Sequence, residues 1–330
     1  MRRCGPHLRR WFPRLALLGL IVMVARGVSW PELWSHMSAA SLPMVCLALV
    51  SNCLACAART ALWWRLLRAI GIRSLALAIR AMLVGMALNC VVVGNAGEAG
   101  RVLLVMRRTG ASAAAVTATV VLERLAVTTG YVAVLVVAGI FVPLPEDLAR
   151  WRVPGMVMLC TGVLVLLRLA REPRVGRLHA GNSRLGAVRH GIQIFRSSVR
   201  QAAAGSRGSL IVGLTGINWI CQLVTFHWTA KALGLPISVG GSVIAMLAVT
   251  ASGSVRATPG NAGVTQLAYV AIAEMLGLSV QAALGVALLL QAIQTAPIAM
   301  GALFVLSDLT AALPSGAHGP PLSASSKARA

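Results

Sequence analysis

The segment Asn89-Cys-Val-Val-Val-Gly-Asn-Ala-Gly-Glu-Ala-Gly-Arg101 lies between apolar runs, yet it holds three glycines, two asparagines, a glutamate and an arginine. Glycines break a helix, and backbone groups freed at membrane depth need partners from protein or from a water-filled cavity. An ionisable pair within a membrane is expensive, so Glu98 and Arg101 are candidate functional residues. The segment therefore predicts a broken helix with a polar site.

Part of this segment occurs twice. The tetrapeptide Gly94-Asn-Ala-Gly97 recurs as Gly260-Asn-Ala-Gly263, directly after Pro259, and apolar runs flank both copies. Interrupted apolar segments at corresponding positions of two halves indicate a binding site between the halves. We therefore expect two similar turns that line one site.

The composition is that of a membrane protein. Of 330 residues, 58% are hydrophobic and 12% are charged, and the mean hydropathy is +0.80. Soluble domains have about twice that charged fraction, and several apolar runs approach the ~20 residues that a membrane helix needs. We expect an all-α, polytopic integral membrane protein.

The chain is strongly basic, with a net charge of +22 from 30 Lys+Arg against 8 Asp+Glu. Most of the arginines lie in short segments between apolar runs, where membrane topology and anionic headgroups explain them. We therefore expect membrane phospholipids as partners and no nucleic acid.

Signals for catalysis are missing from the sequence. The 8 acidic residues argue against a magnesium-dependent transferase, since such sites use clustered carboxylates. The seven cysteines are scattered, and neither a nucleophile elbow nor a Walker motif is present. We expect no catalytic residue, no metal and no cofactor.

The apolar runs predict about six full spans plus two broken hairpins. A membrane domain is expected over residues 1–312, followed by a disordered tail at 313–330. The basic loop 168–207 carries nine arginines and an apolar stripe of helical period, typical of an interfacial amphipathic helix or of a charged linker helix. The expected runs are 15–24, 42–58, 75–93, 102–106, 111–142, 153–167, 210–233, 237–255, 264–276 and 280–306.

The distribution of arginines predicts the orientation. The 42–58 run ends in a basic and aromatic cluster from Arg59 to Arg73, which should be cytoplasmic. The positive-inside rule is satisfied if residues 75–106 form a re-entrant hairpin from the cytoplasm and 237–276 form one from the opposite side. We expect both termini in the cytoplasm, a bacterial inner (plasma) membrane location and an inverted repeat with a midplane site.

Three motifs resemble those of one family. The Asn89 to Arg101 segment, Val121-Leu-Glu-Arg124 and Thr258-Pro-Gly-Asn-Ala-Gly-Val264 are similar to motifs of the membrane domain of lysylphosphatidylglycerol synthases, whose stand-alone members are flippase-like membrane proteins. The resemblance covers residues 10–310 and implies movement of an aminoacylated or glycosylated lipid between leaflets. The aminoacyl-transferase domain of the full-length synthases is missing from this chain, so that activity is not implied.

The chain departs from the family's motifs at two positions. Val93 replaces the usual proline of the first motif, and Gln266 stands where the second motif usually has an acidic residue. Glu274, two helical turns beyond Gln266, could supply that carboxylate, or the carboxylate could be absent.

We expect the candidate site to bind a lipid headgroup. Arginine suits a phosphate because it is always charged and binds in a bidentate manner, and glycine turns offer backbone N–H groups. Alternatively, Glu98 with Arg101 and Glu123 with Arg124 only neutralise each other, and Arg256 only anchors the chain at the interface. The candidate residues are Asn89, Gly94, Asn95, Gly97, Glu98, Arg101, Glu123, Arg124, Arg256, Pro259, Gly260, Asn261 and Gly263.

Three functions fit these features. The first is a lipid flippase that moves an anionic, aminoacylated or glycosylated lipid. The second is a membrane-embedded lipid-modifying transferase, and the third is an accessory scaffold for lipid-synthesis enzymes. The lipid, the direction of transport and the oligomeric state are open at the level of sequence.

Overall fold

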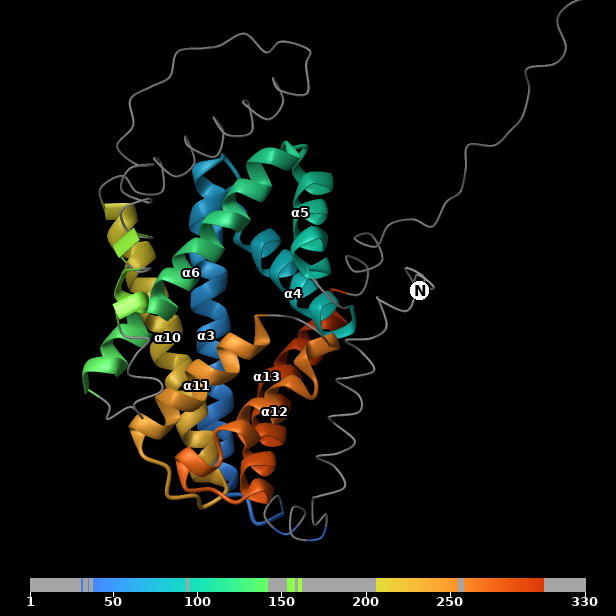
Figure 1. Cartoon of the computed structure of the whole chain (residues 1–330). Helices are drawn as coiled ribbons and strands as arrows, with labels where there is room; N and C mark the ends of the chain where they lie inside the picture. The colour runs from blue at the N-terminus through green and yellow to red at the C-terminus, as the bar shows by residue number, and fades with distance from the viewer. Residues whose placement is uncertain are drawn as a thin grey trace, which may run out of the picture.

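A computed structural model describes residues 38–92, 95–141, 206–254 and 258–305, together with residues 31, 35, 153–157 and 160–161. These residues are helical or lie in turns between helices, and none of them forms a strand (Figure 1). The expected all-α membrane fold is confirmed. Three predicted segments lie outside the described residues: the first apolar run, the 313–330 tail, and the 168–207 loop except for residues 206 and 207.

In the part of the chain that the structure describes, four helices are long and apolar enough to cross a membrane. The predicted runs 42–58, 111–142, 210–233 and 280–306 fall on them. The expected spans at 15–24 and 153–167 lie wholly or mostly outside the described residues. The four helices are α3 (Leu42–Ala69), α6 (Ala113–Phe141), α10 (Ser206–Ala232) and α13 (Val280–Phe304).

Between the long helices lie two pairs of shorter ones. At ~1.5 Å per residue, even the longest of them falls short of the ~30 Å hydrocarbon core. Each pair packs together as an antiparallel hairpin. The first pair is α4 (Leu75–Val91) and α5 (Ala96–Thr109), and the second is α11 (Val239–Gly253) and α12 (Val264–Ala271), with 3-10 turns η1 (Pro259–Asn261) and η2 (Glu274–Leu276).

The two hairpins start from opposite ends of the molecule (Figure 1). The backbone N–H of Ser41 donates to the carbonyl of Ala232 at 2.8 Å, so the start of α3 lies beside the end of α10. Hairpin α11–α12 leaves from that end, whereas hairpin α4–α5 leaves from the end of α3 at Ala69. The predicted opposite sense of the two hairpins is confirmed.

The order of the elements is that of an inverted repeat. Helices α3 to α6 follow the order long, short, short, long, and α10 to α13 repeat it. The two leading helices are antiparallel, since Ser51 Oγ donates to the carbonyl of Cys221 and Thr225 Oγ1 donates to the carbonyl of Ala48. The two halves therefore run in opposite directions, as the repeated tetrapeptide predicted.

One predicted boundary was wrong. Helix α3 does not end near residue 58 but continues to Ala69, so Arg59 and Trp63 lie within a helix that is long enough to cross a membrane and not beyond its end. The helix tolerates these side chains because each has a polar or ionic partner inside the protein: a carboxylate for Arg59 and a hydroxyl for Trp63. The remaining aromatic and basic residues, from Trp64 to Arg73, lie at its end.

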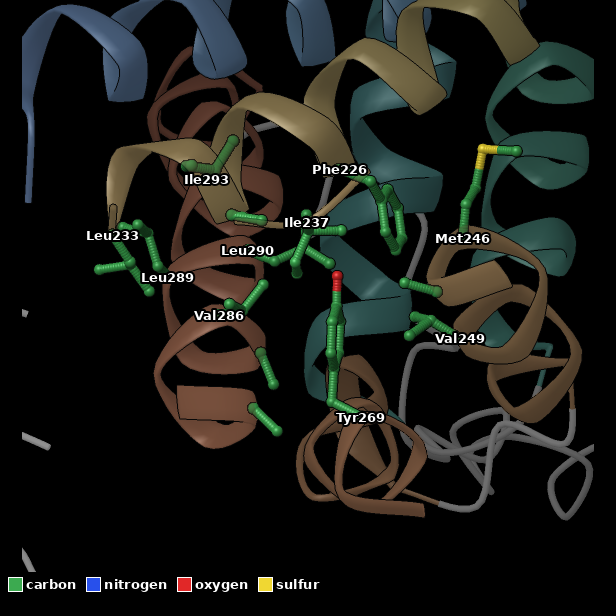
Figure 2. Close-up of a cluster of buried hydrophobic side chains, with 14 of the residues drawn as sticks. Phe226, Leu233, Ile237, Met246, Val249, Tyr269, Val286, Leu289, Leu290 and Ile293 are labelled. Atoms are coloured by element: carbon green, nitrogen blue, oxygen red, sulfur yellow. The ribbon is translucent and has the colours of Figure 1, made fainter. Parts of the chain in front are cut away.

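An apolar core fixes the second hairpin against α10 and α13 (Figure 2). The rings of Phe226 and Tyr269 stack with centroids 6.4 Å apart. Met246 on α11 and Leu290 on α13 complete the contact, and all four side chains are buried. This packing holds the second glycine turn at a defined place.

Candidate functional site

Glycine and asparagine close the first turn. Asn89 Oδ1 on α4 accepts a hydrogen bond from the backbone N–H of Gly97 at 2.9 Å. A Cβ atom on Gly97 would overlap the carbonyl oxygen of Gly85, and one on Gly100 would overlap the side chain of Leu88. The glycines are therefore required by the close approach of α4 and α5.

Glutamines close the second turn. Gln266 Oε1 accepts from the N–H of Gly263 at 2.8 Å, and Gln266 Nε2 donates to Gln291 Oε1 on α13 at 3.1 Å. Gln291 Nε2 in turn donates to the carbonyl of Gly260 at 2.9 Å. The backbone needs glycine here, because Gly260 and Gly263 have φ angles of +59° and +82°.

The second turn contacts the end of α4, which leads into the first turn. A Cβ atom on Gly260 would lie 3.6 Å from both the Cα and the carbonyl oxygen of Cys90, and α4 contacts η1. The contact joins the second tetrapeptide to the residue four positions before Gly94, so the convergence of the two tetrapeptides on one site stays a prediction. Asn95 directly precedes α5, and Pro259 begins η1.

Two candidate residues, Gly94 and Arg256, lie outside the described residues. Asn261, in the second turn, adopts a left-handed φ of +56°, a conformation that asparagine tolerates better than most residues.

The turns differ from the expectation in one respect. The glycine turns were expected to offer free backbone N–H groups to an anion, but the N–H groups of Gly97 and Gly263 each donate to a side-chain carbonyl of their own hairpin. A buried N–H without a partner would destabilise the fold, and the nearby amides of Asn89 and Gln266 satisfy it. These two donors hold the turns closed.

A fully buried carboxylate lies beside the first hairpin. The side chain of Glu123 on α6 has no solvent exposure. Its Oε1 accepts from Nε of Arg59 on α3 at 2.6 Å, and its Oε2 accepts from Nη2 of Arg101 on α5 at 2.5 Å. One carboxylate thus joins three helices.

An aromatic ring and a thioether surround Arg101. Its guanidinium lies 4.8 Å from the ring centroid of Trp63, a cation–π distance, and Nη1 lies 3.6 Å from Sδ of Met82. Trp63 is fixed by its own hydrogen bond to Thr119 Oγ1 at 3.1 Å. With 3% of its side chain exposed, Arg101 is an inner member of the cluster.

A further ion pair joins Arg124 on α6 to Glu98 on α5. Both side chains are partly exposed, at 38% and 18%. Adjacent residues on a helix face different ways, so Glu123 points inward while Arg124 meets the neighbouring helix. Glu123 therefore pairs with Arg59 and Arg101 and not with its neighbour Arg124.

Sequence reasoning missed Arg59 as a site residue. Asn52, Cys56, Arg59 and Trp63 recur at spacings of 4, 3 and 4, which places them on one face of a helix. Asn52 on this face donates to the carbonyl of Ile293 on α13. A polar face with helical spacing was the available signal.

The cluster carries an excess positive charge. Arg59, Arg101 and Arg124 contribute three positive charges, and Glu98 and Glu123 contribute two negative ones, so the five together carry one unit of positive charge. Charges inside transmembrane segments are costly and usually functional. The arrangement can bind an anion.

The suggestion that Glu274 replaces the missing acidic residue was wrong. Helix α12 ends at Ala271, and Glu274 lies exposed in η2, close to the start of α13 and at the opposite end of α12 from the turn. Gln266 itself binds the turn, and its neutral amide meets the neutral amide of Gln291.

Comparison with known families agrees with this architecture. A family model described as the lysylphosphatidylglycerol synthase TM region matches residues 11–301. The chain belongs to this family. The match spans both halves and all three motifs, so the resemblance inferred from the motifs is confirmed.

No curated protein matches the chain. Membership of the lysylphosphatidylglycerol synthase TM region family and the four long apolar helices identify it as a membrane protein.

Proposed function

We propose that this protein moves a lipid with an anionic phosphate headgroup between the two leaflets of a bacterial inner membrane. The observation that supports the proposal best is the cluster of Arg59, Glu123 and Arg101, which lies inside transmembrane helices and carries excess positive charge. A headgroup that leaves water needs such donors, because desolvating its phosphate is otherwise very costly.

The inverted repeat supports transport in particular. Two opposed hairpins that meet at the contact of Cys90 with Gly260 form an arrangement that can rock about a central site. The family is named for the synthase of lysylphosphatidylglycerol, an aminoacylated phospholipid. This name agrees with an aminoacylated or glycosylated lipid as the substrate.

The charge distribution supports an orientation with cytoplasmic termini. Arg65, Arg68 and Arg73 lie at the end of α3, and Arg107 and Arg108 lie at the end of α5. Both ends belong to the side from which hairpin α4–α5 leaves, and the positive-inside rule makes that side cytoplasmic.

The test is lipid movement in liposomes that contain the purified protein and fluorescent anionic, zwitterionic or cationic lipids. We expect the wild type to move the anionic lipid fastest. Arg101→Ala should abolish that movement, because it leaves Glu123 with a single guanidinium partner. Arg68→Gln, which changes an exposed arginine of the same helix that bears Arg59, is the matched control and should keep the wild-type rate.

If the wild type moved none of these lipids, the proposal would be contradicted.

A second function is modification of a lipid by a membrane-embedded transferase. It is favoured by the family, which is the TM region of a lipid synthase. Lipid analysis of a deletion strain separates the two, because a missing lipid indicates a transferase and a lipid in the wrong leaflet indicates a translocase. Binding to lipid-synthesis enzymes in mild detergent, without either effect, would indicate a scaffold.

A further inference from the structure

Within the charge cluster, the arginines differ in their exposure. Arg59 has 26% of its side chain exposed, against 3% for Arg101. Arg124 is also exposed but is paired with Glu98. Of the two arginines that hold Glu123, only Arg59 can therefore be reached by a ligand from outside the cluster.

The hydrogen bonds of Arg59 leave part of its guanidinium available. Its Nε donates to Glu123 Oε1 at 2.6 Å. Among the residues that the structure describes, none accepts a hydrogen bond from the terminal Nη1 and Nη2 groups. A guanidinium presents its donors in a planar fork that matches two oxygens of a phosphate.

The neighbours of Arg59 fix the direction of this fork. Glu123 cannot turn away, because its second oxygen is held by Arg101 and its side chain is fully buried. Arg101 is held in turn by the ring of Trp63. A positioned guanidinium loses less conformational entropy on binding than a free one.

We propose that Arg59 is the direct ligand of the lipid phosphate, with Glu123 and Arg101 as positioning residues. The proposal rests on the proposed function and names the group that touches the substrate. The excess positive charge of the cluster is then neutralised when the phosphate binds Nη1 and Nη2 of Arg59.

The experiment measures binding separately from transport. Purified protein in an uncharged detergent is titrated with dihexanoyl phosphatidylglycerol and with dihexanoyl glycerol, which has the same chains but no phosphate. We expect binding of the first lipid alone. Arg59→Gln should weaken that binding about tenfold to a hundredfold, the loss of charge-assisted hydrogen bonds.

Two further variants keep the test decisive. Arg59→Lys retains the charge beside Glu123 but not the fork, so we expect binding several-fold weaker than wild type even if Arg59→Gln does not fold. Arg68→Gln should bind like the wild type. Wild-type affinity in either Arg59 variant, or no binding by the wild type, would overturn the proposal.

Inorganic phosphate distinguishes a lipid from a free anion. If the phosphate ion displaces the lipid at equal concentration, the site binds free phosphate and the lipid assignment is overturned. Wild-type protein that binds phosphatidylglycerol but moves no lipid contradicts the proposed function and leaves the role of Arg59 intact. If the wild type moves lipid and Arg59→Gln binds phosphatidylglycerol as tightly as the wild type, the proposed function stands and the role of Arg59 is contradicted.

Discussion

At the scale of the residue, the site depends on contacts that cross between helices. Glu123 joins α3, α5 and α6 through two guanidinium groups, and Arg124 beside it pairs with Glu98. Removing one member of a buried ion pair costs about 3 to 5 kcal/mol, because the other charge loses its partner. The cluster therefore stabilises the first half of the molecule as well as offering a positive charge.

Gly97→Ala tests the close contact inside the first hairpin. The added Cβ would overlap the backbone carbonyl of Gly85, so α4 and α5 must separate, and overpacking of this kind costs about 1 to 3 kcal/mol. We expect a lower midpoint of thermal unfolding in detergent.

The matched control for this variant is Gly213→Ala on α10. A Cβ atom at Gly213 meets nothing within 4 Å, and alanine favours a helix over glycine. Its stability should equal or exceed that of the wild type. Equal stability of the Gly97 variant and this control would show that the two helices do not need the glycine.

The sequence was sufficient to find four of the five clustered charges. Glu98, Arg101, Glu123 and Arg124 stood out because ionisable residues are rare in apolar runs. Arg59 did not, because it begins a series of arginines and tryptophans that resembles the edge of a membrane. Which arginine meets which glutamate depends on the packing of three helices, and spacing along one helix cannot reveal it.

At the scale of the element, the two hairpins use different chemistry for the same task. The first turn is closed by Asn89 from within the hairpin, whereas the second is also held from outside by Gln291 on α13. Gln291 binds both the carbonyl of Gly260 and the amide of Gln266. The second turn, and through it the contact with Cys90, therefore depends on α13.

Gln291→Leu should loosen the contact between the second turn and the end of α4. Leucine has a similar size but donates nothing to Gly260 and accepts nothing from Gln266. In a variant whose only cysteine is Cys90, we expect maleimide to label Cys90 faster than in the same background with Gln291 intact.

The control for this experiment is Gln294→Leu on the same helix. The structure shows no hydrogen bond of the Gln294 side chain among the described residues. The labelling rate of Cys90 should stay the same in this variant. Equal rates of Cys90 labelling in the background protein, in Gln291→Leu and in Gln294→Leu would mean that Gln291 does not hold the second turn.

At the scale of the whole molecule, hydropathy and one repeated tetrapeptide were enough to predict the architecture. The structure confirms the two opposed hairpins, and it shows the order long, short, short, long in each half. Helix ends were less predictable, as α3 shows, since a buried partner lets a membrane helix carry an arginine. The last glycines of the two tetrapeptides are both needed: Gly97 for the close approach of α4 and α5, and Gly263 for its positive φ.

Labelling from the two sides of the membrane tests the inverted arrangement. Arg107→Cys lies at the end of α5 and Met275→Cys lies in η2, both at exposed positions. In a cysteine-free background, we expect an impermeant maleimide to reach position 275 from outside the cell and position 107 only after the membrane is opened. Labelling of both positions from the same side would contradict opposed hairpins.

The order of the charges along the chain has a consequence for synthesis at the ribosome. Arg59 and Arg101 are made before Glu123, and between residues 33 and 122 the only carboxylate is Glu98. A nascent chain that ends before α6 therefore inserts α3 with an arginine whose partner does not yet exist. The insertion machinery must accept this helix on the strength of its apolar residues, and α6 then completes the first half when its glutamate arrives.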